Sequence, residues 1–303
     1  MSDTEAGPRP GAEAAGIATI GILGMGHMGA GIAAELSGAG LRVTSCLAGR
    51  SPRGQARAAE AGVAVLPDFP AFIAGCDVFL SVTPADQAEP LADAVATALM
   101  PGRPAPLHFV DCNSITPSRT RRVAARIRGA GAVFSDGGII GAPPGEGRAP
   151  ARLYVSGPEA HRLTALATPQ LLVKPLGPGE TRATEMKILF AAANKGAVAL
   201  LANVLAGAER AGLTDAVIAE LETIRPGLLA GLLGHAGELP DKAGRWAIEM
   251  RDVAEGLADL GVQRGYHDAA ADGYAALDAA LAAAGEAGMA EAPLARVLRA
   301  WQR

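Results

Sequence analysis

The sequence is poor in the residues that mark several large classes of protein. Its 303 residues include only three cysteines, Cys46, Cys76 and Cys112, and none of them forms a C-x-x-C pair. An odd number of cysteines argues against a disulfide framework, so we expect reduced thiols and a cytoplasmic location. The five histidines lack metal-ligand spacing, so no metal site is expected.

The sequence also lacks a basic run, and its first 17 residues lack the apolar core of a signal peptide. A net charge of only −4 gives no reason to expect nucleic acid or an anionic membrane as a partner. Residues 1–17 are rich in Gly, Ala, Pro and acids, which predicts a disordered tail. The long apolar stretch 188–208 contains Asn194, Lys195 and Asn203, which favours a buried helix over a membrane span.

The most informative stretch runs from Ala18 to Ser51. Apolar residues 18–23 are typical of a buried parallel strand, and an Ala-rich segment with helical spacing follows. Between them lies a G-x-G-x-x-G turn, which consists of Gly24, Met25, Gly26, His27, Met28 and Gly29. A second strand candidate begins at Leu41. This order of strand, glycine turn, helix and strand predicts a dinucleotide-binding unit.

Each glycine of the turn has its own physical role. Gly24 permits the tight turn, Gly26 lets the main chain approach a pyrophosphate, and Gly29 lets the helix pack closely on the strand. The pyrophosphate would lie on the free N–H groups at the positive end of the helix. We therefore expect all six residues of the turn to line the cofactor, with no catalytic role for His27.

The end of the second strand lacks the acid that commonly accepts a hydrogen bond from the ribose 2′-OH of NAD. In its place stand Arg50 and Ser51, whose donors suit a 2′-phosphate. The sequence therefore predicts NADP(H) as the cofactor. Arg53 is either a second phosphate ligand or a solvated residue of the next helix.

Strands and helices continue to alternate up to about residue 178, and β signals then disappear. The alternation predicts a doubly wound parallel sheet of Rossmann type over 18–178. The Ala- and Leu-rich remainder predicts an all-helical domain over 179–303, which binds substrate and pairs with a second copy to form a homodimer. The two domains would be joined by one long helix at about 181–211, roughly 45 Å in length at ~1.5 Å per residue.

Candidate site residues follow the ends of predicted strands, where such sheets bind their ligands. Val82, Thr83 and Pro84 follow one strand, and Asn113 and Ser114 follow the next. Ordinary turn chemistry would explain Pro84 or Ser114 taken alone. Together these residues are expected to line the dinucleotide crevice.

A lysine on the predicted long helix is a candidate for proton transfer. Of the 27 basic residues only four are lysine, and Lys187 lies among apolar neighbours. An amine can titrate when desolvated, whereas a guanidinium effectively cannot. The alternative is a lysine that extends its amine to water. Asn194, seven residues on, shares its helix face and could hold the far end of a substrate.

These motifs resemble those of the β-hydroxyacid dehydrogenases, relatives of 3-hydroxyisobutyrate dehydrogenase within the 6-phosphogluconate dehydrogenase superfamily. The glycine turn, Gly49-Arg50-Ser51, Thr83-Pro84 and the segment Asp111–Pro117 each resemble a family motif. Lys187 falls where the family has its catalytic lysine. Arg251 falls where a basic residue of the family reaches the cofactor. The pattern is most similar to a subgroup with a distinct helical C-terminal domain.

The chain departs from the family at the segment that binds substrate. That segment is Asp136–Ala142, in which Ile140 stands where the family has a serine for the substrate carboxylate. The main-chain N–H groups of Ile139, Ile140 and Gly141 would then hold the carboxylate, with Ser114 and Asn194 as further contacts. The 6-phosphogluconate motif Lys-x-x-His-Asn-Gly is missing, so that substrate is not expected.

The resemblance implies reversible NAD(P)-dependent oxidation of a small β-hydroxy acid, with Lys187 as general acid and base. Two alternatives stay open. Imine reductases share the architecture but generally lack a lysine at this position. A protein that senses NADP(H) without catalysis would share the cofactor site alone.

Overall fold

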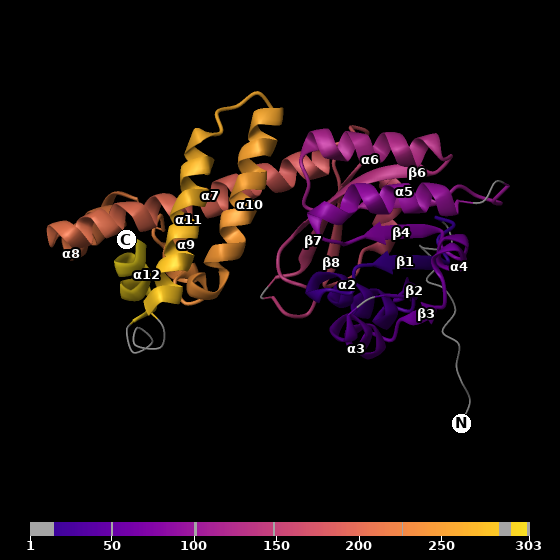
Figure 1. Ribbon diagram of the computed structural model, residues 1–303, viewed down its shortest axis with the longest axis horizontal. Helices are drawn as coiled ribbons and strands as arrows, with labels where there is room; N and C mark the ends of the chain where they lie inside the picture. The colour runs from indigo at the N-terminus through magenta and orange to yellow at the C-terminus, as the bar shows by residue number, and fades with distance from the viewer. Residues whose placement is uncertain are drawn as a thin grey trace. The chain divides into compact units, whose positions relative to one another are not determined.

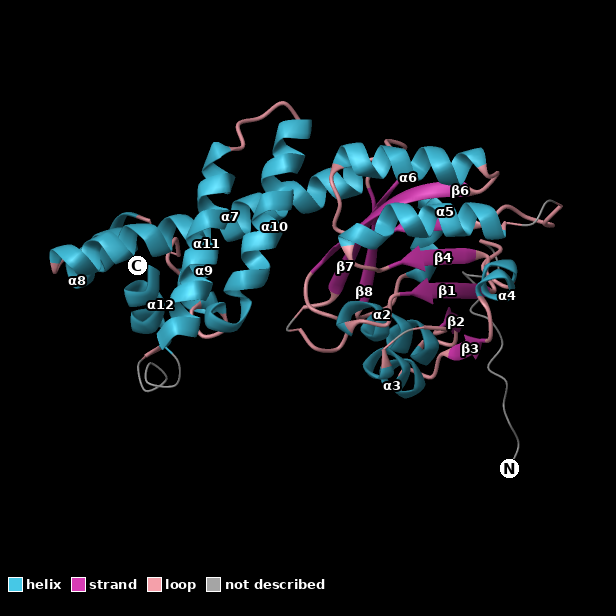
Figure 2. Cartoon of the chain, in the orientation of Figure 1, coloured by secondary structure: helices cyan, strands magenta, loops and turns pink. Residues whose placement is uncertain are grey.

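The computed structural model describes residues 15–49, 51–99, 102–147, 149–225, 227–284 and 292–301. The chain divides into two compact units, one ending at Lys187 and the other starting at Ile188 (Figure 1). All the described strands precede helix α7 (Arg182–Ala211), and the rest of the described chain is helical (Figure 2). The architecture is thus a Rossmann-type α/β sheet followed by a helical region.

The first unit is built on one eight-stranded sheet with the order β3-β2-β1-β4-β5-β6-β7-β8. The strands are β1 (Thr19–Leu23), β2 (Arg42–Cys46), β3 (Ala64–Leu66), β4 (Val78–Ser81), β5 (His108–Asp111), β6 (Val133–Ile140), β7 (Ala151–Ser156) and β8 (Leu171–Pro175). The chain adds β2 and β3 on one side of β1 and β4 onward on the other. Ligands bind at the carboxyl ends of the strands at such a reversal.

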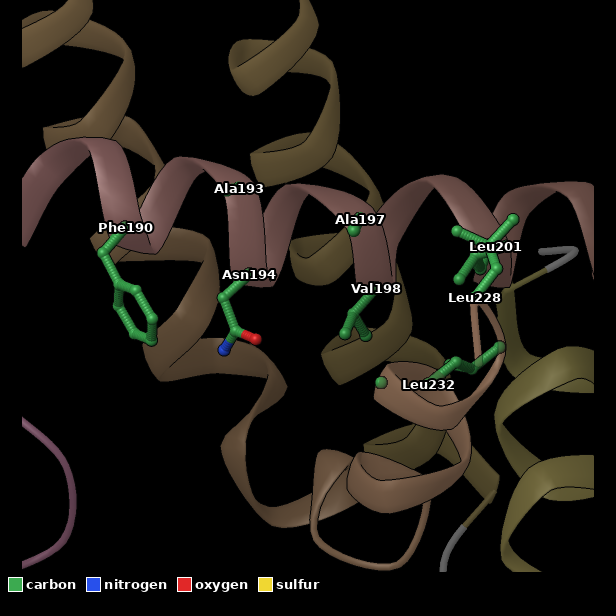
Figure 3. Close-up of a pocket in the computed structure, with 9 residues that line it drawn as sticks. Phe190, Ala193, Asn194, Ala197, Val198, Leu201, Leu228 and Leu232 are labelled. Carbon is green, nitrogen blue, oxygen red and sulfur yellow. The ribbon is translucent and has the colours of Figure 1, made fainter. Parts of the chain in front are cut away.

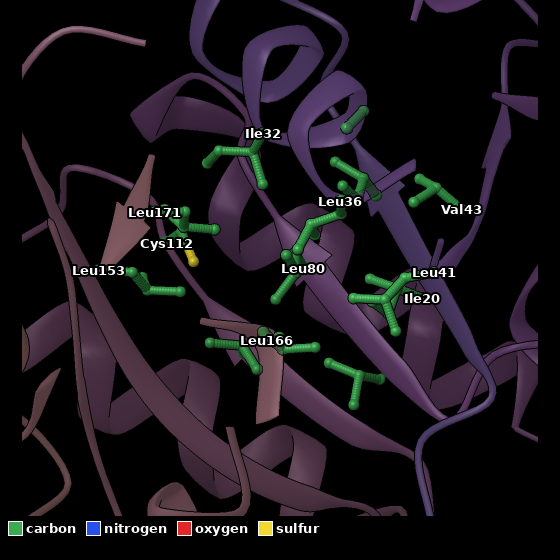
Figure 4. Packing of buried hydrophobic residues seen from close by; sticks show 14 of the residues in the cluster. Ile20, Ile32, Leu36, Leu41, Val43, Leu80, Cys112, Leu153, Leu166 and Leu171 are labelled. Carbon is green, nitrogen blue, oxygen red and sulfur yellow. The ribbon is translucent and has the colours of Figure 1, made fainter. Parts of the chain in front are cut away.

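Helices cover both faces of the sheet because each face is apolar. On one face, α2 (His27–Gly38), α3 (Pro52–Glu60) and the 3-10 helix η2 (Ala160–Leu166) pack on a buried cluster that includes Ile20, Leu36 and Leu80 (Figure 4). On the other face lie α4 (Phe69–Ala74), α5 (Ala88–Ala98) and α6 (Pro117–Gly129). Aromatic rings, among them Phe79 stacked on Phe109 at 5.2 Å, fill that second core.

The sheet differs from the expected all-parallel arrangement at one place. Strands β6 and β7 are antiparallel, whereas every other neighbouring pair is parallel. The physical reason is the short link from Gly141 to Pro150, since antiparallel neighbours need no helical crossover. The expected substrate segment Asp136–Ala142 is therefore mostly strand and not loop, because Asp136–Ile140 continue β6 and pair with β7.

The start of the folded chain also differs from the sequence expectation. Residues 1–14 of the predicted tail lie outside the described residues. Ile17, the last residue of that tail, is 2% exposed and belongs to the core of the sheet. The carbonyl of Ala15 accepts a hydrogen bond from Arg162, and Asp77 accepts from the main-chain N–H of Ala18 and of Thr19. The segment that leads into β1 is thus held in place by side chains from distant parts of the unit.

The second unit is helical throughout its described part. After α7 it contains α8 (Thr214–Ile224), α9 (Ala230–His235), α10 (Leu239–Asp259), α11 (Gly265–Ala284) and α12 (Pro293–Trp301). Trp246, Tyr274 and Trp301 meet edge to face at its centre. Helix α7 is long and apolar enough to span a membrane by length and composition, but its Val198, Ala202 and Leu205 are buried in this core. A core helix of a soluble protein passes the same test.

Candidate functional site

The glycine turn between β1 and α2 packs closely on itself and on Val82, the residue that follows β4. Gly24 has φ +107°, and a Cβ there would lie 2.1 Å from the carbonyl oxygen of Val82. A Cβ on Gly29 would lie 2.0 Å from the carbonyl oxygen of Gly24. Both positions therefore require glycine. A Cβ on Gly26, by contrast, would meet no described atom within 4 Å, so the main chain there is open to a ligand.

The turn presents the N-terminus of α2 toward that open space. Gly26 is the N-cap residue, and no described side chain caps the helix, so its first N–H groups stay available for an anion. Met25 and Met28 pack toward the core. His27 is exposed, and its Nε2 lies 2.9 Å from a carboxylate oxygen of Glu146, in the link that follows β6. The arrangement fits the pyrophosphate of a dinucleotide.

The end of β2 lies beside the same turn. A Cβ on Gly54 would lie 3.8 Å from the carbonyl oxygen of Met25, so the start of α3 packs against the glycine turn. The Ser51 hydroxyl caps α3 by accepting from the N–H of Gly54 at 3.3 Å. Arg53 is exposed in the first turn of α3. Arg50, on which the NADP(H) expectation depends, lies outside the described residues.

The ends of β4 and β5 are joined by the side chain of Asn113. Its amide oxygen accepts from the main-chain N–H of Thr83 at 2.7 Å and from the Thr83 hydroxyl at 3.2 Å. Its amide nitrogen donates to the Ser81 hydroxyl at 2.8 Å. Asn113 is 4% exposed, so its side chain fixes the strand-end loop that carries Val82, Thr83 and Pro84. That loop forms one wall of the space beside Gly24.

Lys187 and Ser114 are brought together from separate elements. The amine of Lys187, on α7, donates to the Ser114 hydroxyl, just beyond β5, at 2.6 Å. The two residues are 73 positions apart in the sequence. Lys187 is partly exposed and Ser114 is exposed, so this pair is open to a small molecule. A Cβ on Gly138 would lie 3.4 Å from the Cβ of Lys187, so α7 passes closely over β6.

Sequence reasoning missed the residues that hold α7 in this position. The buried carboxylate of Asp136, on β6, accepts from the N–H of Thr184 at 2.8 Å and from its hydroxyl at 2.7 Å. The Ser156 hydroxyl accepts from the N–H of Ala183 at 3.1 Å. A negative group at the N-terminus of a helix is favourable. The sequence does carry one indication of this role, because Asp136 is an acid within an apolar strand and such a residue is rarely buried without partners.

A second buried acid, Asp111, lies beside Asp136 on the neighbouring strand β5. Asp111 pairs in register with Asp136, and burial raises the pKa of the Asp111 carboxyl to about 6. Burial likewise raises the pKa of Asp136 to about 7, against the hydrogen bonds from Thr184, which lower it. One oxygen of Asp111 has no hydrogen-bond partner among the described residues. No group of three or more His, Cys, Asp or Glu in the described chain could hold a metal ion.

The three residues expected to hold the substrate carboxylate lie at the end of β6. Ile139 and Ile140 pair with Leu153 and Arg152 of β7 and are both buried. The backbone groups of this segment that face β7 therefore take part in the sheet. Gly141 follows with φ +117°. The main chain here offers fewer free N–H groups than the expected loop would.

Two of the expected site residues lie in the helical unit. Asn194 lines a cavity of about 280 Å³ on α7, where it points to the same side as Phe190 and Val198 (Figure 3). The guanidinium of Arg251 pairs with Asp272 and, at 3.5 Å, with Asp268, both on α11. Their roles toward substrate and cofactor stay predictions.

The two glycines at the turn should respond differently to alanine. Gly24→Ala should lower the free energy of unfolding by about 2–4 kcal/mol, because its φ and the Val82 carbonyl both oppose a side chain. Gly26→Ala should change stability by less than about 0.5 kcal/mol but weaken dinucleotide binding. Denaturant unfolding and fluorescence titration with NADPH measure the two effects. Equal stability of both variants would contradict the geometry.

Burial of Asp111 should make stability depend on pH. The folded-state pKa exceeds the ordinary value of 3.8, so folding takes up a proton between about pH 4 and pH 6, and stability falls as the pH rises through this range. Asp111→Asn should remove up to about 3 kcal/mol of this fall, as measured by denaturant unfolding from pH 4 to pH 8. Asp93→Asn, at an exposed ion pair with Arg126, is the control and should keep the wild-type profile. An unaltered profile in Asp111→Asn would contradict the assignment.

Comparison with known families identifies both parts of the chain. Residues 19–168 match the NAD binding domain of 6-phosphogluconate dehydrogenase. Residues 208–277 match a domain of unknown function, DUF1932. The first match spans β1 through η2 and includes the glycine turn, which indicates a nicotinamide cofactor.

Individual proteins agree with these matches. Probable 3-hydroxyisobutyrate dehydrogenases of Mycobacterium tuberculosis and Mycobacterium bovis are 32% identical over 142 residues, so the match spans about half of each protein, 47% of this chain and 47% of the relative. A conserved hypothetical protein from Sinorhizobium meliloti has a TM-score of 0.75 and 25% identity, covering 94% of this chain and 97% of that one.

The structure of Mycobacterium tuberculosis 3-hydroxyisobutyrate dehydrogenase with L-serine has a TM-score of 0.73 and 20% identity, covering 95% of this chain and 100% of that one. This likeness shows a shared fold over both units. The glycine turn, the domain order and the relatives agree: residues 19–168 belong with the NAD binding domain of 6-phosphogluconate dehydrogenase, and the chain is similar to β-hydroxyacid dehydrogenases with a distinct helical C-terminal domain.

Proposed function

We propose that the protein is an NADP(H)-dependent oxidoreductase that acts on the CH–OH group of a small β-hydroxy acid, or reduces the matching aldehyde or ketone. The observation that carries the proposal is the Lys187 amine, 2.6 Å from the Ser114 hydroxyl at the carboxyl edge of the sheet. The glycine turn reaches the same edge. A proton-transfer group and a dinucleotide turn at one edge are what such a reaction requires.

The cofactor fits the residues at the ends of β1, β2 and β4. The N–H groups at the start of α2, next to the open Gly26, would hold the pyrophosphate. The loop of Val82, Thr83 and Pro84, fixed by Asn113, would bound the nicotinamide side. A cavity of about 210 Å³ lined by Leu23, Thr83 and Leu91 adds an apolar slot at this edge. When bound, the nicotinamide supplies the hydride or accepts it.

The chain's own part in the reaction is to move one proton. Lys187 would take the proton from the substrate hydroxyl during oxidation and return it to the carbonyl oxygen during reduction. Ser114, which accepts from the Lys187 amine, would orient that amine and share the substrate oxygen. The hold of Asp136 on Thr184, one helical turn before Lys187, keeps the amine over the sheet edge.

Three further expectations complete the proposal. Arg50, Ser51 and Arg53 would bind the 2′-phosphate that distinguishes NADP(H) from NAD(H). The helical unit would form a homodimer, which is supported by exposed apolar side chains such as Leu200, Val204 and Ile224. Light scattering would measure that assembly. A cytoplasmic location is consistent with three free, buried cysteines.

Replacement of Lys187 tests the proton-transfer role. Lys187→Met should lower turnover by about 10²-fold or more and leave NADPH binding nearly unchanged, because the amine serves the substrate and not the dinucleotide. Lys242→Met, which removes an amine bound to Glu238 in the helical unit, is the matched control. Steady-state absorbance of NADPH measures turnover. Full activity in Lys187→Met would overturn the mechanism.

Replacement of Arg50 tests the choice of cofactor. Arg50→Ala should weaken NADPH binding by about 10- to 100-fold, because a charged hydrogen bond to the 2′-phosphate is lost, and leave NADH binding nearly unchanged. Fluorescence titration with both nucleotides measures the effect. Equal weakening of the two would contradict the assignment.

A substrate panel separates the proposal from its alternatives. Small β-hydroxy acids, the matching aldehydes and cyclic imines would each be tested with NADP⁺ or NADPH. Turnover of hydroxy acids supports the proposal. Turnover of imines alone would favour an imine reductase, and binding of NADPH without any turnover would favour a sensor.

A further inference from the structure

Arg152, the second residue of β7, is a half-buried cation with no partner in the described chain. Its guanidinium makes no hydrogen bond or ion pair with any other described residue. Two other arginines of this unit, by contrast, are engaged: Arg103 donates to four carbonyl groups, and Arg119 binds Glu89. Partial burial of a guanidinium costs solvation, so a position without a partner is suited to an anionic ligand.

The strand register puts Arg152 on the face of the sheet that Lys187 covers. In the antiparallel pair β6–β7, Arg152 lies opposite Ile140, and Tyr154 lies opposite Gly138. Residues that lie opposite each other share a face. Lys187 packs over Gly138, its Cβ 3.4 Å from the position of a Cβ there. Gly138 and Ile140 are successive positions on this face, ~7 Å apart along the strand.

The guanidinium extends toward the carboxyl end of β6. One terminal nitrogen of Arg152 is 3.9 Å from the position that a Cβ of Gly141 would take. Gly141 has no side chain to cover the guanidinium from that side. Ser114, bound to Lys187, lies at the same edge of the sheet, beyond the neighbouring β5. A small molecule at Lys187 is therefore within reach of Arg152.

The neighbouring side chains Ile140, Lys174 and Asp136 are less suited than Arg152 to bind the anionic group of a substrate. Ile140 is apolar and 5% exposed, and it lies opposite Arg152 in the β6–β7 pair. Lys174 lies 5.9 Å above the ring of Tyr154 and is exposed, so it adds positive potential rather than a shaped receptor. The acid on this face, Asp136, already accepts hydrogen bonds from Thr184.

We propose that Arg152 binds the anionic group of the substrate, a carboxylate or a phosphonate, while Lys187 serves the hydroxyl-bearing carbon. The planar guanidinium matches either oxyanion with two parallel hydrogen bonds. Arg152 then selects acids over neutral alcohols. This inference rests on the proposed function for the reaction, but the binding of the anion can be measured without it.

Binding to the NADPH-saturated full-length protein tests the inference, because a hydroxy acid cannot react with the reduced cofactor. The probes are 3-hydroxypropanoate, 2-hydroxyethylphosphonate and the neutral 1,3-propanediol, each measured by calorimetry. Arg152→Met should weaken binding of the favoured anion by about 10- to 100-fold and leave the diol unchanged. The tighter of the two anions on the wild type identifies the oxyanion.

Two further variants separate the role of Arg152 from general effects. Arg152→Lys should recover part of the affinity, because the charge stays and the paired geometry is lost. Arg121→Met removes an exposed arginine of α6 and should bind the anions like the wild type. Thermal melting of each variant establishes that it is folded, and Arg152→Gln replaces Arg152→Met if that variant does not fold.

The inference is overturned if neither anion binds the wild type, if the diol binds as tightly as the anions, or if Arg152→Met binds the anions unchanged. A measurement of turnover distinguishes the failure of this inference from the failure of the proposed function. Absence of turnover with every hydroxy acid, with anion binding still dependent on Arg152, removes only the proposed reaction. Turnover in Arg152→Met with an unchanged KM removes only the role of Arg152, since its loss should raise KM and leave kcat within a few-fold.

Discussion

The carboxylate of Asp136 is the constraint on which the candidate site depends. It accepts from both the N–H and the hydroxyl of Thr184, at 2.8 and 2.7 Å, and so fastens the first turn of α7 to the centre of the sheet. Lys187 follows within one turn, and its amine reaches Ser114 at 2.6 Å. Burial raises the pKa of Asp136 to about 7, a cost that these hydrogen bonds offset in part. The position of the amine thus depends on a buried group on β6 that makes its hydrogen bonds to the first turn of α7.

The dinucleotide side and the substrate side of the candidate site differ in whether main chain or side chains form them. The dinucleotide side is mostly main chain, because glycines at 24, 26 and 29 leave room for the backbone and for the N-terminus of α2. The substrate side is made of side chains from several strands and one helix. The dinucleotide side lies within the part of the chain that matches the NAD binding domain of 6-phosphogluconate dehydrogenase, residues 19–168.

The glycine turn and its neighbours could be predicted from the sequence because their requirements are local. Gly24 needs a positive φ, and its motif lies between a strand and a helix that are adjacent in the chain. The bridge from Asn113 to Thr83 could be placed only roughly, since it depends on which strand ends are neighbours. The pairing of Asp136 with Thr184 spans 48 residues, and the antiparallel register of β6 and β7 reverses an expected direction. Neither follows from spacing along the chain.

The register of β6 and β7 has a consequence for how this fold can diversify. Position 152 lies on a different strand from Asp136, and its side chain takes no part in the hydrogen bonds that fasten α7. A change there would leave Lys187 and the glycine turn as they are. With the roles proposed for Arg152 and Lys187, the type of acid accepted and the chemistry performed on it can evolve separately, because the two side chains come from different elements, β7 and α7.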